Sequence, residues 1–426
     1  MTSASVARWT SDERIAVARL AGLDQMTTAR LRSLLLGRRP GAAVGRVLDG
    51  AVEHEPVGRL LRRDPAVAHR WRAQLAERSA ARIGAELADL DVRVLGPEDP
   101  EWPPPLLVDP DPPPALFVCG RLDTTVRRVA VVGTRNPTAG GLEIAARFGH
   151  GLASAGVAVV SGLALGIDGA AHRGALAAAE ASLVAVVANG HDRPYPKRHA
   201  ALWREVTRHG AVVSEWPPGT APEAHRFPRR NRIIAAMSEA VIVVESRERG
   251  GSLLTARDAA ERGVEVMAVP GAPGARAAAG TNKLVQDGAA LVVDVDDVLT
   301  FLQLDHSGAG RLPADPRPAP SGDEMVVLGA LRDGPTTVDR LAGRLGLDLG
   351  VAAMHLARLE RSGWAFEVDG WFEALDEWAR LLDSAGVGEQ GTPATRGDAA
   401  SITPERQVNS GVGSVLGAVG AHDVCS

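Results

Sequence analysis

Between residues 126 and 301 the sequence alternates short runs of β-branched residues with stretches of helical periodicity. The runs typical of strands are Val129–Val132, Val157–Val160, Leu183–Val187, Val212–Val213, Val241–Val244, Val264–Val269 and Leu291–Val293. Continuous apolar runs are typical of strands that are covered on both faces, and alternation of strand with helix indicates parallel pairing. We therefore predict an α/β fold with a Rossmann-like, mostly parallel sheet. Ligands of such sheets bind at the carboxyl ends of the strands.

The segments on either side of this sheet have a different character. Residues 10 to 90 show helical spacing, typical of a helix-hairpin-helix or SAM-like domain or of a small bundle without a ligand. Three helical patterns followed by a hairpin around Asp369-Gly370 predict a winged helix, which serves either DNA binding or dimerisation. The predicted division is a helical domain at 1–95, the sheet domain at 96–304, a linker at 305–322, a winged helix at 323–380 and a disordered tail at 385–426.

A proline-rich segment precedes the sheet. It runs from Pro97 to Pro114, and proline excludes a regular α-helix because it lacks the backbone donor and clashes with the preceding turn. Leu106 and Leu107, with Leu116 just beyond, are apolar. We predict an extended linker that packs at least partly against the sheet domain.

Composition excludes several classes of protein. The net charge of −5 means that any nucleic-acid site is a local basic patch. The charged start of the chain does not resemble a signal peptide, and no apolar run reaches about 18 residues, so we predict neither secretion nor membrane spanning. Cys119 and Cys425 are far apart, which argues against a disulfide framework or a cysteine zinc site. We expect a cytoplasmic protein without a metal or a cofactor.

Glycine and small polar residues follow five of the predicted strands. Glycine lets the backbone approach a ligand, and amides at helix starts attract anions. The loops are Val132–Thr138, Ser161–His172, Asn189–Asp192, Arg249–Ser252 and Pro270–Gly271. They contain neither the dinucleotide pattern G-x-G-x-x-G nor a Gly-Lys pair, which argues against a Walker A loop. His172 could act as a base, but a structural role fits its helical position better.

The densest positive charge lies ahead of the apolar stretch 233–237. Arg226, Arg229, Arg230 and Arg232 fall within seven residues of an overall acidic chain, which predicts an anion site at a loop-to-helix junction. The alternative is a solvated positive helix start.

These segments together resemble the DNA-processing protein A (DprA/Smf) family. The matching pieces are Val132-Gly133-Thr134-Arg135, Ser161-Gly162-Leu163-Ala164 with Gly166-Ile167-Asp168 and Ala171-His172, Tyr195-Pro196, Ser214-Glu215, Phe227-Pro228 with Arg230-Asn231-Arg232-Ile233-Ile234, Gly251-Ser252-Leu253 with Thr255-Ala256, and Pro270-Gly271 with Gly280 and Asn282. The resemblance implies a homodimeric protein that binds single-stranded DNA. It would protect incoming strands and promote loading of the RecA recombinase in natural transformation, without being an enzyme.

Motif matching and the strand-end loops together predict the residues that bind DNA phosphates. They are Gly133, Thr134, Arg135, Ser161, Gly162, Arg230, Asn231, Arg232, Gly251, Ser252, Asn282 and, as an addition outside the motif, Lys283. Because the sheet domain contains few aromatic residues, we expect phosphate contacts to outweigh base stacking.

Two other functions remain open. Nucleotide-processing phosphoribohydrolases have a similar sheet and the pattern P-G-G-x-G-T-x-x-E. Here Gly250-Gly251-Ser252 lacks the second Gly-Thr pair and its glutamate, and Asp258 is the acid that could replace it. The third possibility is a protein-interaction scaffold that acts mainly through the winged helix.

Overall fold

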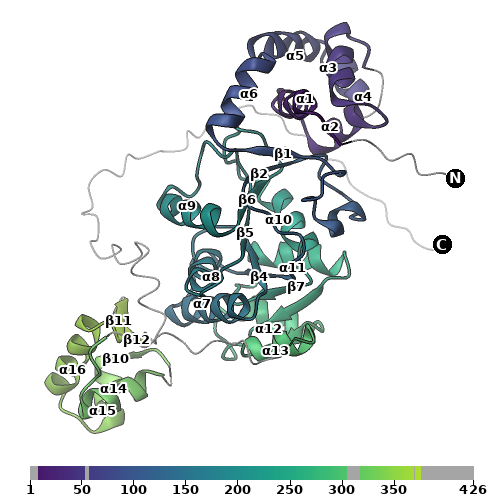
Figure 1. Ribbon diagram of the computed structural model, residues 1–426. Coiled ribbons are helices and arrows are strands. Elements are labelled where there is room, and N and C mark those ends of the chain that lie inside the picture. Colours follow the sequence, from purple (N-terminus) through teal and green to yellow (C-terminus); the bar gives the residue numbers. More distant parts are fainter. Residues whose placement is uncertain (1–7, 53–56, 305–316, 333, 369, 376–426) are drawn as a thin grey trace, which may run out of the picture. The chain divides into compact units, whose positions relative to one another are not determined.

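A nine-stranded sheet forms the centre of the computed structural model (Figure 1). The structure describes residues 8–52, 57–304, 317–332, 334–368 and 370–375. The strand order is β1-β2-β6-β5-β4-β3-β7-β8-β9. All pairings from β6 to β9 are parallel, whereas β1 and β2 pair antiparallel at one end of the sheet. The predicted Rossmann-like, mostly parallel sheet is therefore confirmed.

The strands are short and most are buried. Their bounds are β1 Arg93–Leu95, β2 Leu116–Gly120, β3 Arg128–Val132, β4 Ala158–Ser161, β5 Leu183–Val187, β6 Ala211–Ser214, β7 Ala240–Val243, β8 Glu265–Ala268 and β9 Ala290–Leu291. Every residue of β3, β4, β5, β6 and β7 is buried, as expected for strands that have helices on both faces. All seven predicted strands exist, and their ends shift by at most two residues.

Seven α-helices belong to the sheet domain within the described residues. They are α7 Ala139–Ser154, α8 Ile167–Leu176, α9 Ala200–His209, α10 Arg226–Ala236, α11 Ser252–Ala260, α12 Ala279–Gln286 and α13 Val295–Phe301, and Lys197–His199 adds the 3-10 turn η2. Buried residues of α7, α8, α9 and α13 share one core with the sheet. Those of α10 and α11 share another, on the opposite face of the sheet (Figure 1).

The proline-rich segment is more ordered than the sequence suggested. It contains a single 3-10 turn, η1 Pro104–Leu107, whose Leu106 is fully buried beside α10. β1 precedes the segment and β2 follows it, so the sheet begins at residue 93 instead of 96. Sequence reasoning missed both strands because β1 has only three residues and β2 directly follows a run of prolines, where strand propensity is hard to recognise.

The N-terminal region is helical, as predicted. Its helices are α1 Ser11–Ala21, α2 Thr28–Leu35, α3 Pro40–Asp49, α4 Val57–Arg63, α5 Ala66–Glu77 and α6 Ala80–Asp89. Helices α1 to α5 share a separate hydrophobic core that includes the fully buried Trp71. The Trp71 indole N–H donates to the Asp24 carbonyl at 2.8 Å. The helix-hairpin-helix or SAM-like character of this domain remains a prediction.

The predicted winged helix is also present. It consists of α14 Gly322–Arg332, β10 Thr336–Thr337, α15 Val338–Leu345, α16 Leu349–Arg361, β11 Ala365–Val368 and β12 Trp371–Ala374. The three strands form a separate small sheet, and Leu341, Leu356 and Leu359 belong to a core shared by all three helices.

Part of the predicted organisation lies outside the described residues. This applies to residues 305–316 of the linker and to the tail at 385–426. Among the described helices, none combines the length and apolar character needed to cross a bilayer. Within the same ranges, no three His, Cys, Asp or Glu side chains gather as metal ligands would.

Candidate nucleic-acid interface

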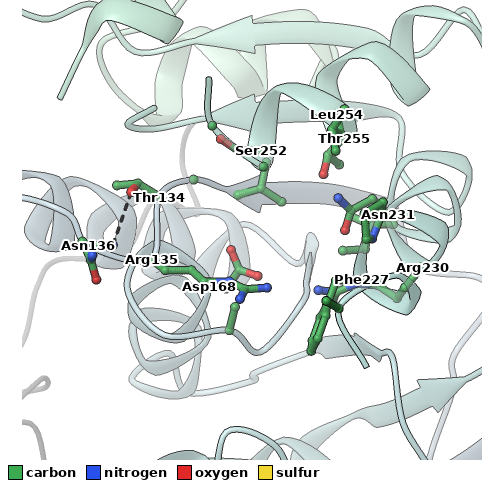
Figure 2. A pocket seen from close by; sticks show the side chains of 18 of the residues that line it. Thr134, Arg135, Asn136, Asp168, Phe227, Arg230, Asn231, Ser252, Leu254 and Thr255 are labelled. Carbon is green, nitrogen blue, oxygen red and sulfur yellow. Dashed lines mark hydrogen bonds between the residues drawn. The ribbon is translucent and has the colours of Figure 1, made fainter. Parts of the chain in front are cut away.

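An open pocket of about 610 Å³ lies at the carboxyl ends of β3 and β7. The sheet order reverses here, since β4 to β6 lie on one side of β3 whereas β7 to β9 lie on the other. Such a reversal leaves a crevice between the loops that follow the two neighbouring strands. The pocket is bordered by the loop before α7, the face of α10 and the start of α11 (Figure 2).

The loop from β3 to α7 contributes Gly133, Thr134, Arg135 and Asn136 to the pocket. Its backbone is fixed from both sides, because the Thr134 amide donates to the Glu245 carbonyl at 2.8 Å and the Asn136 amide donates to Thr134 Oγ1 at 3.2 Å. The loop is therefore preorganised, and the exposed side chain of Arg135 extends from it.

Helix α10 presents one face to the pocket. Phe227, Arg230, Asn231 and Ile234 line it, at the spacing of neighbours along one side of a helix (Figure 2). Arg230 is buried at 3% exposure, and its Nη1 donates to the carbonyl of Val186.

Close packing around Arg230 requires a glycine opposite it. A Cβ at Gly162 would lie 2.1 Å from Arg230 Nη1, so a larger residue would displace the guanidinium group. Gly162 acts on the site through this packing and through its amide, which donates to Asp168 Oδ2 at 3.1 Å.

The start of α11 supplies the third side of the pocket. Gly250, Gly251 and Ser252 line it, and no side chain caps the N-terminus of the helix. The first amides of such a helix, together with its dipole, favour an anion. Arg247 and Arg249, in the loop that precedes α11, add exposed positive charge.

Positive charge dominates the pocket. Four of the described residues that line it are arginines, whereas Asp168 is the only carboxylate among them. Burial lowers the pKa of Arg230 to about 10, which leaves it charged at neutral pH. Burial raises the pKa of Asp168, and nearby Arg230 opposes that shift. The fold thus gathers a local cluster of positive charge in an overall acidic protein, and anion binding there stays a prediction.

The pocket also contains two aromatic rings that the residue prediction omitted. The Arg135 guanidinium carbon lies 4.9 Å from the centroid of the Phe227 ring, and Tyr195 lies 5.6 Å from the same ring between centroids. Both residues occur in the matched sequence motifs, but only their position in the fold shows that they meet. The expectation that phosphate contacts outweigh base stacking stays a prediction, now with two aromatic rings placed in the pocket.

Seven of the predicted residues line the pocket and five do not. Those in the pocket are Gly133, Thr134, Arg135, Arg230, Asn231, Gly251 and Ser252. Arg247, Arg249, Phe227, Tyr195 and Asp168 also line it but were not predicted. Arg249 is directly adjacent to the predicted Gly251 loop, so charge beside a glycine-rich loop was a usable signal.

The predicted residues outside the pocket have other partners. Ser161 is fully buried, and its hydroxyl donates to the Val131 carbonyl at 2.6 Å. Asn282 exchanges two hydrogen bonds of 3.0 Å with the backbone of Gly271, and exposed Lys283 pairs with Asp287, the residue just after its helix. These contacts join loops or stabilise helices, which gives Ser161 and Asn282 a structural reason to occur in the motif.

Arg232 is the clearest departure from the predicted site. It does not line the pocket, it is 7% exposed, and its Nη2 lies 2.5 Å from Oε1 of buried Glu215. A helix turns about 100° per residue, so Arg232 points away from its pocket-lining neighbour Asn231. Adjacency in sequence therefore suggested a shared role that the helix geometry separates.

Two side chains considered for catalysis also lie outside the pocket. Asp258, the acid of the phosphoribohydrolase alternative, is half-buried on α11 and near Arg262. His172 is fully buried on α8, and neither ring nitrogen has a hydrogen-bond partner. Burial lowers the pKa of His172 to about 3, with further lowering by nearby His199 and Arg173. His172 is therefore uncharged at neutral pH and does not line the pocket.

Comparisons with known proteins agree with this geometry. Residues 93–303 match the family described as DNA recombination-mediator protein A, and residues 311–370 match the DprA winged helix domain. The chain is similar to a Mycobacterium tuberculosis (strain H37Rv) protein named as DNA processing protein DprA, with 40% identity over 326 residues, or 70% of this chain and 82% of that protein. It is also similar to protein Smf of Escherichia coli K12, with 39% identity over 282 residues, or 64% of this chain and 75% of that protein.

Solved structures show the same likeness. The X-ray structure of DNA processing protein A from Streptococcus pneumoniae is similar, with a TM-score of 0.55, 31% identity and coverage of 70% of this chain and 99% of that one. DNA processing protein A from Helicobacter pylori, whose structure concerns its mode of binding single-stranded DNA, matches with a TM-score of 0.45, 27% identity and coverage of 50% and 95%.

The buried state of His172 predicts a loss of stability in acid. The unfolded chain takes up a proton on this histidine below about pH 6.5, whereas the folded protein does so only near its pKa of about 3. The free energy of unfolding contributed by His172 is therefore complete above pH ~6.5 and falls as the pH drops. Relative to His172→Leu, the wild type should lose about 2 kcal/mol between pH ~7.5 and pH ~5 in urea unfolding. Parallel pH dependence of the two proteins would contradict this assignment.

Proposed function

The chain belongs to the DNA recombination-mediator protein A (DprA/Smf) family, and from this premise we propose that it binds single-stranded DNA without strong sequence preference. The observation that carries the proposal is the pocket at the β3 and β7 ends, where arginines, a helix N-terminus and an aromatic ring lie together. Arginine and helix amides suit phosphates, and an aromatic face stacks on any base.

The chemistry of the pocket supports a preference for single strands over duplex DNA. In a duplex the bases are stacked on each other and unavailable to Phe227 and Tyr195, whereas a single strand offers both phosphates and base faces. We propose phosphate contacts for Arg135, Asn231, Arg247 and Arg249, which line the pocket, with buried Arg230 supplying further charge. Gly133, Gly251 and Ser252 allow the strand to approach the backbone.

We further propose that the protein protects incoming strands and promotes loading of RecA during transformation and recombination in the cytoplasm. Family membership supports this role. Because binding of DNA without catalysis suffices for it, we propose a binding protein without catalytic activity. The phosphoribohydrolase alternative loses its support because Asp258 does not line the pocket. If RecA-dependent strand exchange on protein-coated single-stranded DNA proceeds equally well with and without this protein, the loading role is contradicted.

The homodimer is a further part of the proposal. β9 is the outermost strand of the sheet, and the exposed fractions of Leu291, Val293 and Phe301 are 52%, 61% and 45%. Apolar side chains at an open sheet edge are typical of an interface. Light scattering should give twice the mass of one chain, and Leu291→Glu should shift it toward the monomer. A monomeric wild type at micromolar concentration would refute the dimer.

Arg135 provides the direct test of phosphate binding. Replacing it with glutamine should lower the affinity for a fluorescent oligothymidine by about 1.5–3 kcal/mol, because a charge-assisted hydrogen bond is lost. The slope of log affinity against log salt concentration should become shallower by about 0.7, as for one released counterion on a single strand. Arg121→Gln, at an exposed arginine paired with Asp123 outside the pocket, serves as the control and should leave the slope unchanged.

Phe227 provides the test of base stacking. Phe227→Leu keeps an apolar side chain but removes the aromatic face, so the affinity should fall by about 1–3 kcal/mol in the same anisotropy titration. The salt slope should stay constant, because no phosphate contact is lost. Phe366→Leu in the winged helix is the matched control. Equal affinities of Phe227→Leu and the wild type would exclude stacking on this ring.

A further inference from the structure

All three nitrogen positions of the Arg232 guanidinium group are occupied by partners within the protein. Nη2 lies 2.5 Å from Glu215 Oε1, Nη1 donates to the Asp111 carbonyl at 2.7 Å, and Nε lies 3.2 Å from Asp111 Oδ2. Glu215 is 5% exposed and follows β6, whereas Asp111 belongs to the proline-rich segment. Arg232 thus joins α10 both to the end of a central strand and to the segment that precedes the sheet.

The same proline-rich segment is fixed to the neighbouring helix by a second buried ion pair. Arg262 Nε, two residues beyond α11, lies 2.7 Å from Asp109 Oδ2, and the two side chains are 9% and 2% exposed. α10 and α11 pack against each other and form two sides of the pocket. Asp111 therefore contacts α10, and Asp109 contacts the residues just after α11, in both cases through an arginine that does not line the pocket.

Burial determines how strongly these contacts constrain α10. An exposed ion pair contributes little, but removal of one partner of a buried pair leaves an uncompensated charge. Burial raises the pKa of Glu215, and Arg232 opposes the shift. A Glu215 carboxylate deprived of Arg232 would have to take up a proton or reach water by moving α10.

We propose that Arg232 is a positioning residue for the nucleic-acid pocket. Through Glu215 and Asp111 it fixes the rotation of α10, so that Phe227, Arg230 and Asn231 face the bound strand, and it does not itself contact phosphate. The proline-rich segment is then a brace for the pocket instead of a passive linker. This proposal rests on the proposed binding of single-stranded DNA.

A double-mutant cycle separates positioning from direct contact. Arg232→Gln should weaken oligothymidine binding about tenfold, within the range of coupling between contacting residues, because buried Glu215 loses its charged partner. The double variant Arg232→Gln with Glu215→Gln restores a neutral hydrogen-bonded pair and should recover most of this affinity. If Arg232 contacts phosphate, the double variant binds no better than Arg232→Gln, and that result would overturn the proposal.

Glu215→Gln alone keeps the test decisive even where Arg232→Gln folds poorly. Positioning predicts weaker binding, whereas a phosphate-binding Arg232 predicts equal or tighter binding once its competing carboxylate is removed. Asp109→Asn, at the other end of the brace, should also weaken binding. Arg257→Gln, at an exposed Arg–Glu pair on α11, is the matched control and should not change the affinity.

The salt dependence of binding separates positioning from a direct phosphate contact. Arg232→Gln should keep the wild-type salt slope, because no phosphate contact is removed, whereas loss of a direct contact makes the slope shallower by about 0.7. A shallower slope would contradict positioning. Absence of binding by the wild type in the same titration would instead defeat the proposed function, so the two failures are distinguishable.

Discussion

Buried guanidinium groups hold the pocket-lining helices in place, and the rest of the site depends on them. Arg230 contacts the end of β5, Arg232 contacts Glu215 beyond β6, and Arg262 contacts Asp109. A guanidinium group has a fixed planar set of donors, so each pairing fixes an orientation as well as a distance. The parallel strands all end at the same edge of the sheet, but the rotation of α10 and α11 over that edge requires these polar contacts.

The same contacts reconcile an acidic chain with an anion site. Several basic residues outside the pocket pair with carboxylates, for example Arg127 with Glu239. In the pocket, arginines outnumber carboxylates, since Asp168 is the only carboxylate among its described lining residues. We therefore expect the net charge of the protein to contribute little to DNA binding. The attraction would come from the local field, the helix N-terminus and the aromatic ring of the pocket.

Periodicity predicted the fold because both-face burial leaves an unmistakable apolar run in each central strand, such as Leu183–Val187. It missed β1 and β2, which lie at the antiparallel end of the sheet beside prolines. Motif matching likewise found the pocket loops, but it could not divide a motif by function. Arg230, Asn231 and Arg232 are consecutive in sequence, yet only the first two line the pocket. Phe227 was omitted because its importance comes from Arg135, nearly a hundred residues earlier, lying over its ring.

The division between Arg230 and Arg232 can be read from their unused donors. Arg230 has one direct acceptor, the Val186 carbonyl, and its Nε has no hydrogen-bond partner. A buried donor without a partner is costly, so a bound anion or an ordered water at the pocket floor would relieve that cost. Arg232 has no such deficit, because carboxylates and a carbonyl occupy all of its nitrogen positions. Arg230 thus keeps a donor that a ligand could use, whereas all the donor nitrogens of Arg232 contact groups within the protein. Guanidinium groups in one short motif can therefore differ in role through the acceptors that the surrounding strands bring to them.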